Sequence, residues 1–130
     1  MATLVVVLGP AQGQKFSLGH HQLVIIGRDH DATFQILDGR ISRYHLQLKR
    51  LANSDVHAAV DFNSANGVHV NDHKISAETV LHDGDVIRIG DTSILYSIKD
   101  EPDAQTITQL MRKHGEGRYK TMIEPPAQST

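Results

Sequence analysis

The 130-residue chain contains no cysteine, which excludes disulfide bonds, thiolate metal sites and cysteine nucleophiles. Aromatic residues are also scarce, at 5% of the sequence, so a hydrophobic core has to be filled by Leu, Ile and Val. Apolar residues make up 39% of the chain, which is enough for a single core. The length predicts one domain of about 100 residues with an appendage.

The chain also lacks a large excess of charge of one sign, and it lacks long apolar runs. The net charge is only -2, so no overall field attracts nucleic acid or an anionic membrane, and an anion site has to be local. No run approaches the roughly 20 apolar residues of a membrane helix. The apolar start, Met1–Leu8, follows no basic region of the kind found in secretory signals. We expect a soluble, cytoplasmic protein that binds neither nucleic acid nor a membrane.

What the sequence does contain is a series of short apolar runs separated by turn residues. Turn signals such as Asp38-Gly39 and Asp83-Gly84 recur roughly every 8–12 residues, and Gly accepts the positive φ that tight turns need. This pattern favours an all-β, antiparallel sandwich or barrel. The predicted strands are Thr3–Leu8, Lys15–Leu18, Leu23–Ile26, Thr33–Leu37, Tyr44–Leu51, Val56–Phe62, Val68–Val70, Asp85–Ile89 and Ser93–Ile98.

The composition changes after residue 99, where three acids and a proline end the last predicted strand. We therefore assign residues 1–99 to the β-domain. We assign residues 100–130 to an acidic linker, a short helix and a flexible tail, which we expect to be disordered.

The short helix is predicted over residues 104–114. Asp103 is a suitable N-cap and Gly115 a suitable stop. Isolated helices below about 12–15 residues barely form, so this one has to dock on the β-domain or on another chain, or remain largely unfolded. Its apolar residues share one face: Ile107, Leu110 and Met111.

Three loops carry the residues whose side chains are best suited to binding a ligand. Arg28 follows Gly27 at the end of an apolar run, and a guanidinium offers a planar fork of donors that suits phosphate oxygens. Ser42 and Arg43 stand just before a predicted strand and add a hydroxyl donor and a second cation. His45, at the start of that strand, is expected to brace the loop backbone.

The third loop ends in Asn66-Gly67, which alone is an ordinary hairpin turn. A side-chain amide can donate to one peptide carbonyl and accept from one peptide N–H, so Asn66 can hold an extended ligand backbone. Gly67 supplies the turn that aims it. Together the three loops suit a phosphate monoester carried by an extended peptide.

These motifs occur in an order that resembles the forkhead-associated (FHA) domain family. Gly-Arg is followed by Ser-x-x-His, by Ser-x-Asn-Gly and by the closing pattern Leu-x-x-Gly-Asp-x-Ile-x-Ile-Gly, over roughly residues 2–98. The residues that match the closing pattern are Leu81, Gly84, Asp85, Ile87, Ile89 and Gly90.

The resemblance implies an eleven-stranded β-sandwich that binds phosphothreonine peptides through loops at one end. In that pattern Arg28 and Ser42 are phosphate ligands, Arg43 is an auxiliary phosphate contact, and Asn66 holds the ligand backbone. Arg40 corresponds to a position that reads the residue three after the phosphothreonine, where an arginine favours Asp or Glu. The positions that match structural residues of the family site are Gly27, His45 and Gly67.

The chain departs from the family pattern at two positions. Ala65 stands where relatives often carry Thr or Ser, so one hydroxyl contact to the ligand is missing. Val68 replaces a common Thr, which changes only local packing. Neither departure removes a phosphate ligand.

The expected function is therefore phosphothreonine-dependent protein binding in signalling, downstream of a Ser/Thr kinase. No cofactor, metal or catalytic residue is predicted. The tail itself offers a candidate ligand, because Thr121 is followed three residues later by Glu124. A phosphate-independent FHA-type scaffold or oligomerisation domain is an alternative.

Two further classes find less support in the sequence. Ser42, His45 and Asp61 could form a hydrolytic triad on paper, but no Gly-x-Ser-x-Gly elbow accompanies them. The nine histidines invite a metal site, notably at His30 and along His69–His73, but they lack the His-Glu-x-x-His pattern and cysteine partners.

Overall fold

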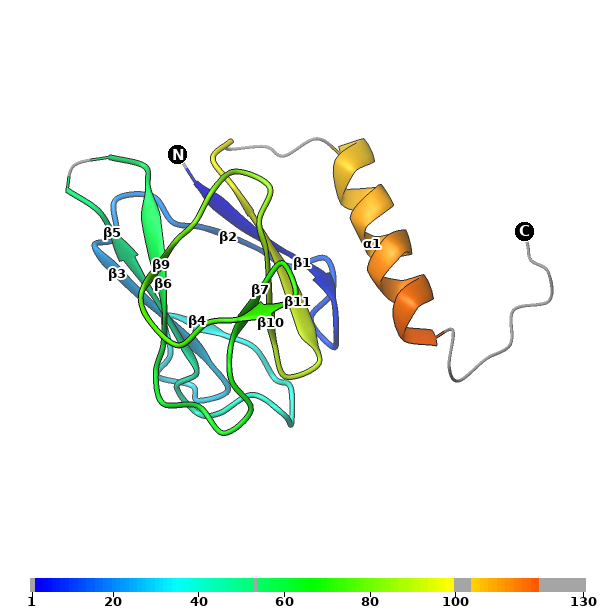
Figure 1. The fold of residues 1–130 in the computed structure, drawn as a ribbon, viewed down its shortest axis with the longest axis horizontal. Coiled ribbons are helices and arrows are strands. Elements are labelled where there is room, and N and C mark those ends of the chain that lie inside the picture. The colour runs from blue at the N-terminus through cyan, green and yellow to red at the C-terminus, as the bar shows by residue number, and fades with distance from the viewer. Residues whose placement is uncertain (1, 53, 100–103, 120–130) are drawn as a thin grey trace.

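The computed structural model describes residues 2–52, 54–99 and 104–119, and within them the chain forms two packed β-sheets and one helix. The predicted eleven-stranded β-sandwich is confirmed (Figure 1). The strands are β1 (Thr3–Leu8), β2 (Lys15–Ser17), β3 (Leu23–Gly27), β4 (Phe34–Gln35), β5 (Leu46–Arg50), β6 (His57–Asp61), β7 (His69–Val70), β8 (His73–Lys74), β9 (Thr79–Val80), β10 (Val86–Ile89) and β11 (Thr92–Ser97).

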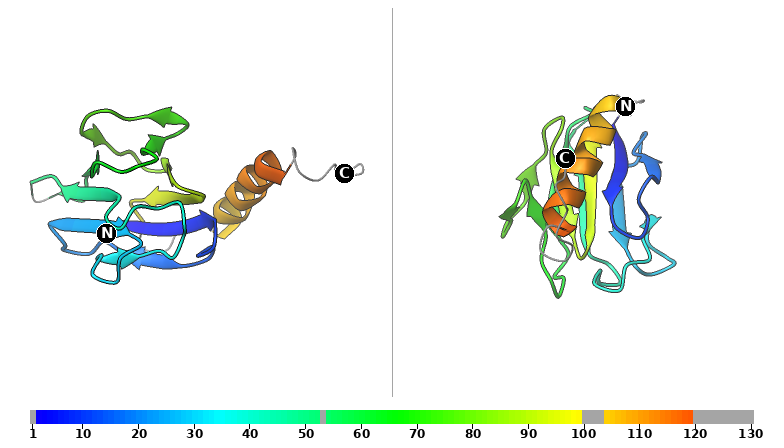
Figure 2. Two further views of the ribbon diagram at one scale, coloured as in Figure 1. Left: turned by 90° about the horizontal axis from the view of Figure 1, so that it is seen from below. Right: turned by 90° about the vertical axis from the view of Figure 1, so that its right-hand side faces the viewer.

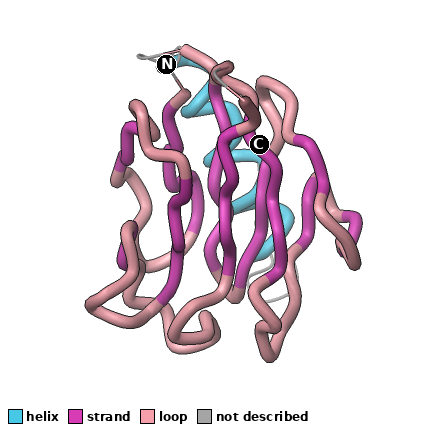
Figure 3. Tube along the Cα trace, turned by 90° about the vertical axis from the view of Figure 1, so that its left-hand side faces the viewer, coloured by secondary structure: helices cyan, strands magenta, loops and turns pink. Residues whose placement is uncertain are grey.

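The first sheet has the strand order β2-β1-β11-β10-β7-β8, and the second has the order β4-β3-β5-β6-β9. The two sheets face each other, with long loops gathered at one end of the sandwich (Figures 2 and 3). The expectation of purely antiparallel pairing is wrong at one place. β4 pairs with β3 in parallel, with Ile26 opposite Phe34, because the chain crosses over before it reaches β4.

The core between the sheets is built from alternating aliphatic residues, as the scarcity of aromatics requires. Leu46 and Leu48 of β5 and Ile87 and Ile89 of β10 are fully buried and point into it. Tyr96 is the largest side chain in this core. Alternate residues of each strand point outward, so each sheet also has an outer face.

Over β1 and β11, the outer face of the first sheet is covered by helix α1 (Ala104–Tyr119), which stands beside these strands (Figure 1). This explains why every residue of β1 is buried, although alternate residues of a one-sided strand would be exposed. The helix docks on the sandwich, which is one of the three states expected for it. The contacts join Ile107, Leu110 and Met111 to Val5, Val7, Val86 and Leu95.

The helix extends to Tyr119, beyond the end predicted at residue 114, and Gly115 lies within it. A glycine in a helix interior costs about 1 kcal/mol relative to alanine, which weakens a helix without ending it. Residues 116–119, which belong to the tail expected to be disordered, continue this helix. The predicted N-cap Asp103 and the tail around Thr121 lie outside the described residues. Neither the length nor the composition of α1 allows a membrane crossing.

Candidate functional site

Gly27 ends β3 at the point where the chain comes closest to the segment that carries Ser42. The backbone N–H of Arg28 donates to the Ser42 carbonyl at 3.1 Å, and the N–H of Asp29 donates to the Arg43 carbonyl at 3.1 Å. A Cβ on Gly27 would clash with the Arg43 carbonyl oxygen and lie 2.9 Å from the Cα of Tyr44. Glycine at this position therefore lets the first two loops lie side by side.

The Arg28 side chain is exposed and held at its base. Its Nε donates to the carbonyl oxygen of Ile41 at 3.0 Å, which fixes the direction of the guanidinium. Among the described residues, no carboxylate forms an ion pair with Arg28. The guanidinium is thus oriented by the loop, and no ion pair with a described carboxylate balances its charge.

Arg43 lies in the same loop cluster but already has a partner. Its Nε and Nη2 lie 3.0 and 2.9 Å from Oδ2 of Asp29. The pKa of Asp29 is lowered, first by the N–H of Asp31 and then by Arg43. Asp29 therefore orients Arg43 and balances part of its charge, unlike the charge of Arg28.

Ser42 is placed so that its hydroxyl proton is available. Its backbone N–H donates to Nδ1 of His45 at 3.0 Å, and its Oγ accepts the N–H of Ala65 at 3.0 Å. A hydroxyl has one proton and two lone pairs, so Ser42 Oγ still has its O–H to donate to a ligand.

His45 connects the second loop to the third from a fully buried position. Because Nδ1 accepts the Ser42 N–H, the ring proton is on Nε2, which donates to the Gly67 carbonyl at 2.7 Å. The expectation that His45 braces loop backbone agrees with these two bonds.

The third loop is shaped by local hydrogen bonds. Gly67 has a φ of 82°, in the left-handed region, and its N–H donates to Oγ of Ser64 at 2.9 Å. The exposed side chain of Asn66 donates through Nδ2 to the carbonyl oxygen of Arg40 at 2.8 Å. Its Oδ1 and second N–H remain for a ligand, so Asn66 can make the two backbone contacts predicted for it.

Arg40 projects from the turn between the first two loops, with 73% of its side chain exposed. The turn is held by Asp38, only 2% exposed, whose carboxylate accepts the N–H of Arg40 at 2.9 Å. The same carboxylate accepts the N–H of Asp91 at 2.9 Å and the hydroxyl of Thr92 at 2.7 Å. Asp38 thereby ties this turn to the β10–β11 turn.

The hydrolytic triad considered from the sequence is not assembled. His45 meets the backbone N–H of Ser42 and not its hydroxyl, and its other nitrogen is engaged by Gly67. The Oδ1 of Asp61 accepts the N–H of Ser64 at 2.9 Å. The three side chains are used to hold loops together.

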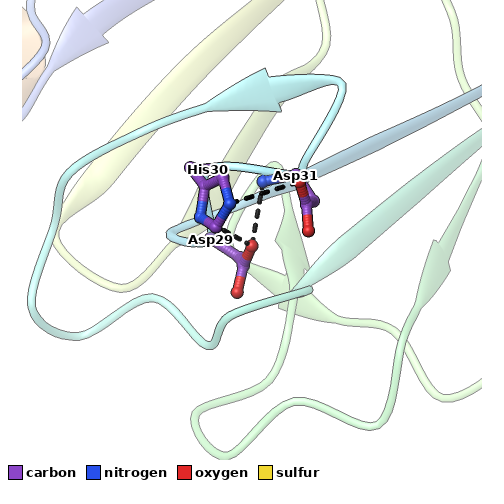
Figure 4. A group of neighbouring side chains, drawn as sticks. All are labelled: Asp29, His30 and Asp31. Atoms are coloured by element: carbon purple, nitrogen blue, oxygen red, sulfur yellow. Dashed lines mark hydrogen bonds and ion pairs between the residues drawn. The ribbon is translucent and has the colours of Figure 1, made fainter.

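One group of potential metal ligands is found among the described residues: Asp29, His30 and Asp31, shown in Figure 4, whose ligand atoms lie within 4.8 Å of one another. His30 is 83% exposed, and the Asp29 carboxylate is engaged by Arg43. Asp31 is also exposed, Asp29 is partly buried, and the group lies next to the candidate anion site. Its arrangement suits orientation of Arg43 at least as well as ligation.

The structure thus brings together at one end of the sandwich the side chains of Arg28, Ser42, Arg43, Asn66 and Arg40. They supply guanidinium, hydroxyl and amide donors around an open surface, which suits a tetrahedral anion and an adjoining extended chain. Sequence reasoning missed the roles of Asp29, Asp38 and the Ala65 N–H. The Asp38-Gly39 turn signal pointed to Asp38, but nothing in the sequence pointed to its distant partners.

Comparison with known proteins gives a consistent picture. Residues 24–90 match the FHA domain family model. FhaA, an FHA domain-containing protein of Mycobacterium tuberculosis, is 42% identical over 71 residues, which cover 55% of this chain and 13% of FhaA. The chain therefore corresponds to a small part of this relative's length.

Solved structures agree with the sequence match. The FhaA FHA domain, crystallised in complex with the intracellular domain of another protein, is 36% identical, with a TM-score of 0.64 over 74% of this chain and 99% of that one. A second structure, from an analysis of phosphothreonine-dependent FHA domain interactions, is 35% identical, with a TM-score of 0.66 over 77% of this chain and 98% of that one.

Proposed function

Because the chain belongs to the FHA domain family, we propose that it is a phosphothreonine-dependent protein-binding module. It binds extended segments of Thr-phosphorylated proteins, the products of a Ser/Thr kinase, through the loops at one end of the sandwich. The observation that carries this proposal is Arg28, a guanidinium oriented by the Ile41 carbonyl without an acidic partner among the described residues, beside the available hydroxyl of Ser42.

Each residue has a distinct role in this proposal. Arg28 and Ser42 bind the phosphate directly, and Arg43 adds a second, partly balanced cation. Asn66 holds the ligand backbone, and Arg40 favours an acidic residue three positions after the phosphothreonine. The loop geometry is kept by Gly27, His45 and Gly67, with the hydrogen bonds and close contacts described for them.

The charge of the ligand explains why binding depends on phosphorylation. A phosphothreonine carries about -1.5 to -2 charges at pH 7 and three acceptor oxygens, whereas threonine offers one hydroxyl. Unmodified threonine would leave Arg28 without an anion and gain little. We expect dissociation constants of about micromolar order. The function is binding, with no catalytic step, and we propose the cytoplasm as its location.

The test measures the affinity of wild type and variants for one peptide in three forms: unphosphorylated, with phosphoserine and with phosphothreonine. Arg28→Ala should weaken phosphopeptide binding by about 10- to 100-fold, because charge-assisted hydrogen bonds contribute about 1.5–3 kcal/mol. Arg28→Lys should recover only part of this, since lysine lacks the planar fork.

Arg112→Ala, which removes an exposed arginine of α1, is the matched control and should bind as wild type does. Equal affinity of Arg28→Ala and wild type would contradict the proposal. Equal binding of phosphorylated and unphosphorylated peptide would favour the alternative, a phosphate-independent scaffold. A peptide containing phosphorylated Thr121, measured alongside, tests whether the chain's own tail is a ligand.

A further inference from the structure

Three basic residues lie side by side on the outer face of the first sheet, close to the third loop. Arg88 of β10 is directly opposite His69 of β7, and His69 is directly opposite Lys74 of β8. Residues directly opposite each other in antiparallel strands project from the same face of the sheet. We call His69, Lys74 and Arg88 the basic row.

The basic row is electrostatically unfavourable in the absence of an anion. Whenever His69 is protonated, it places like charges directly opposite each other in the sheet, which destabilises the pairing. The pKa of His69 is lowered, first by burial and then by Arg88 and Lys74, with only a small opposing effect from Asp72. Among the described residues, no carboxylate forms an ion pair with Arg88 or Lys74.

Within the basic row, Arg88 is the residue with a buried hydrogen-bond donor that lacks a partner. It is half-buried, and its Nε is buried without a hydrogen-bond partner among the described residues. A buried donor left unpaired costs about 1–3 kcal/mol or more when it is charged. A bound anion that accepts from the terminal N–H groups of this guanidinium would stabilise its charge.

The basic row adjoins the residues proposed to hold the ligand backbone. A pocket of ≈ 210 Å³ is lined by His69 and Arg88 together with Asn66 and Gly67, and Arg40 and Gly90 close its other side. Lys74 lies over the same turn, because a Cβ on Gly67 would be 2.9 Å from Cε of Lys74. An extended peptide held by Asn66 would therefore pass directly beside the row.

We propose that the basic row binds a second anionic side chain of the ligand, a carboxylate or a second phosphate, on the far side of Asn66 from the primary phosphate. This inference rests on phosphothreonine binding at the Arg28 loops. Arg40 lies on the opposite side of the same pocket, where its Nε is 3.8 Å from a carboxylate oxygen of Asp91. Arg88 offers a half-buried guanidinium, and Lys74 an exposed point charge, to the same group.

The experiment is a positional scan of phosphothreonine peptides with otherwise neutral flanks. A single Glu, or a single phosphoserine, is moved through each position on both sides of the phosphothreonine, and affinity is measured by fluorescence anisotropy. At an offset distinct from the one read by Arg40, we expect binding to strengthen about five- to tenfold. A gain with phosphoserine alone would identify the second group as a phosphate, and a gain with both would include carboxylates.

Variants assign the gain to the basic row. Lys74→Gln and Arg88→Gln should each remove most of it while leaving affinity for the neutral-flank peptide within about twofold. Arg40→Gln should leave this gain in place. Lys99→Gln, an exposed lysine just after β11 and away from the row, is the matched control.

The outcomes are distinguishable. Phosphate-dependent binding without a gain at any further offset, or with a gain that Lys74→Gln retains, would overturn this inference alone. Absence of binding to every phosphopeptide would overturn the phosphothreonine module itself, and this inference with it. Lys74 is exposed, so its variant decides the question even where Arg88→Gln perturbs folding.

Discussion

Gly27 offers the sharpest test of how the backbone builds the site. A Cβ at this position would lie 2.7 Å from the carbonyl carbon of Arg43 and 2.9 Å from the Cα of Tyr44. Both neighbours are backbone atoms, so no side-chain rotation relieves the clash. Gly27→Ala therefore has to push the first two loops apart.

The expected cost follows from what that separation breaks. Overpacking a close contact costs about 1–3 kcal/mol. The hydrogen bonds from the N–H groups of Arg28 and Asp29 to the carbonyls of Ser42 and Arg43 lie across the same contact, and each contributes about 0.5–1.5 kcal/mol. We expect Gly27→Ala to lower the free energy of unfolding by about 2–5 kcal/mol and the Tm by at least about 8 °C.

Two assays together check this reasoning. Chemical denaturation gives the stability, and phosphopeptide titration of the folded variant at low temperature gives the affinity, which should fall because Arg28 and Ser42 separate. Gly39→Ala is the control, since nothing lies within 4 Å of a Cβ at Gly39. A stability of Gly27→Ala within about 0.5 kcal/mol of wild type, or a destabilised variant with unchanged affinity, would refute the reasoning.

Three further outcomes are expected. Burial lowers the pKa of His57, so the unfolded chain binds a proton more readily than the folded one, and stability should fall as the pH drops below about 6.5. Thermal melts of His57→Gln should show a smaller fall in Tm over the same pH range. An equal dependence of Tm on pH in both proteins would contradict this. Asn66→Ala should weaken phosphopeptide binding about three- to tenfold in titrations while shifting the Tm little, because Asn66 is exposed; unchanged affinity would remove Asn66 from the site. Leu110→Ala should reduce stability by about 1 kcal/mol and loosen α1, seen as lower helical ellipticity, with Gln109→Ala as an exposed control; equal ellipticity in both variants would mean that Leu110 does not anchor the helix.

The longer strands could be predicted because each carries its own pattern. β1 was placed at its observed bounds by six consecutive residues rich in valine and leucine. β8 and β9 were missed because each has two residues, too few to show alternation. His73 and Lys74 of β8 are also exposed and polar, so no local signal marks a strand there; register with β7 alone creates it.

The site likewise has features that the sequence predicts and features that it does not. The three loops were found because Gly27-Arg28, Ser42-Arg43 and Asn66-Gly67 each combine a turn residue with a ligand-type side chain. What could not be predicted is the pairing among them. The Arg43–Asp29 ion pair joins residues that only the fold brings together.

Arg88 illustrates a further limit of local patterns. Its place between the apolar residues Ile87 and Ile89 of β10 favours a side chain that points to solvent. The structure half-buries it, because His69 and helix α1 flank the same outer face. Exposure on a sheet face depends on what covers that face, and the covering elements here come from distant parts of the chain.

The buried carboxylate of Asp38 has a consequence for how the protein acquires its activity. Its Oδ2 accepts hydrogen bonds from Asp91 and Thr92, which follow it by more than 50 positions. The turn bearing Arg40 can settle only once the final hairpin has formed, so competence to recognise a ligand should appear late in folding, after the last strand is available. A nascent chain that has not yet been synthesised past that hairpin would be unable to capture its target prematurely.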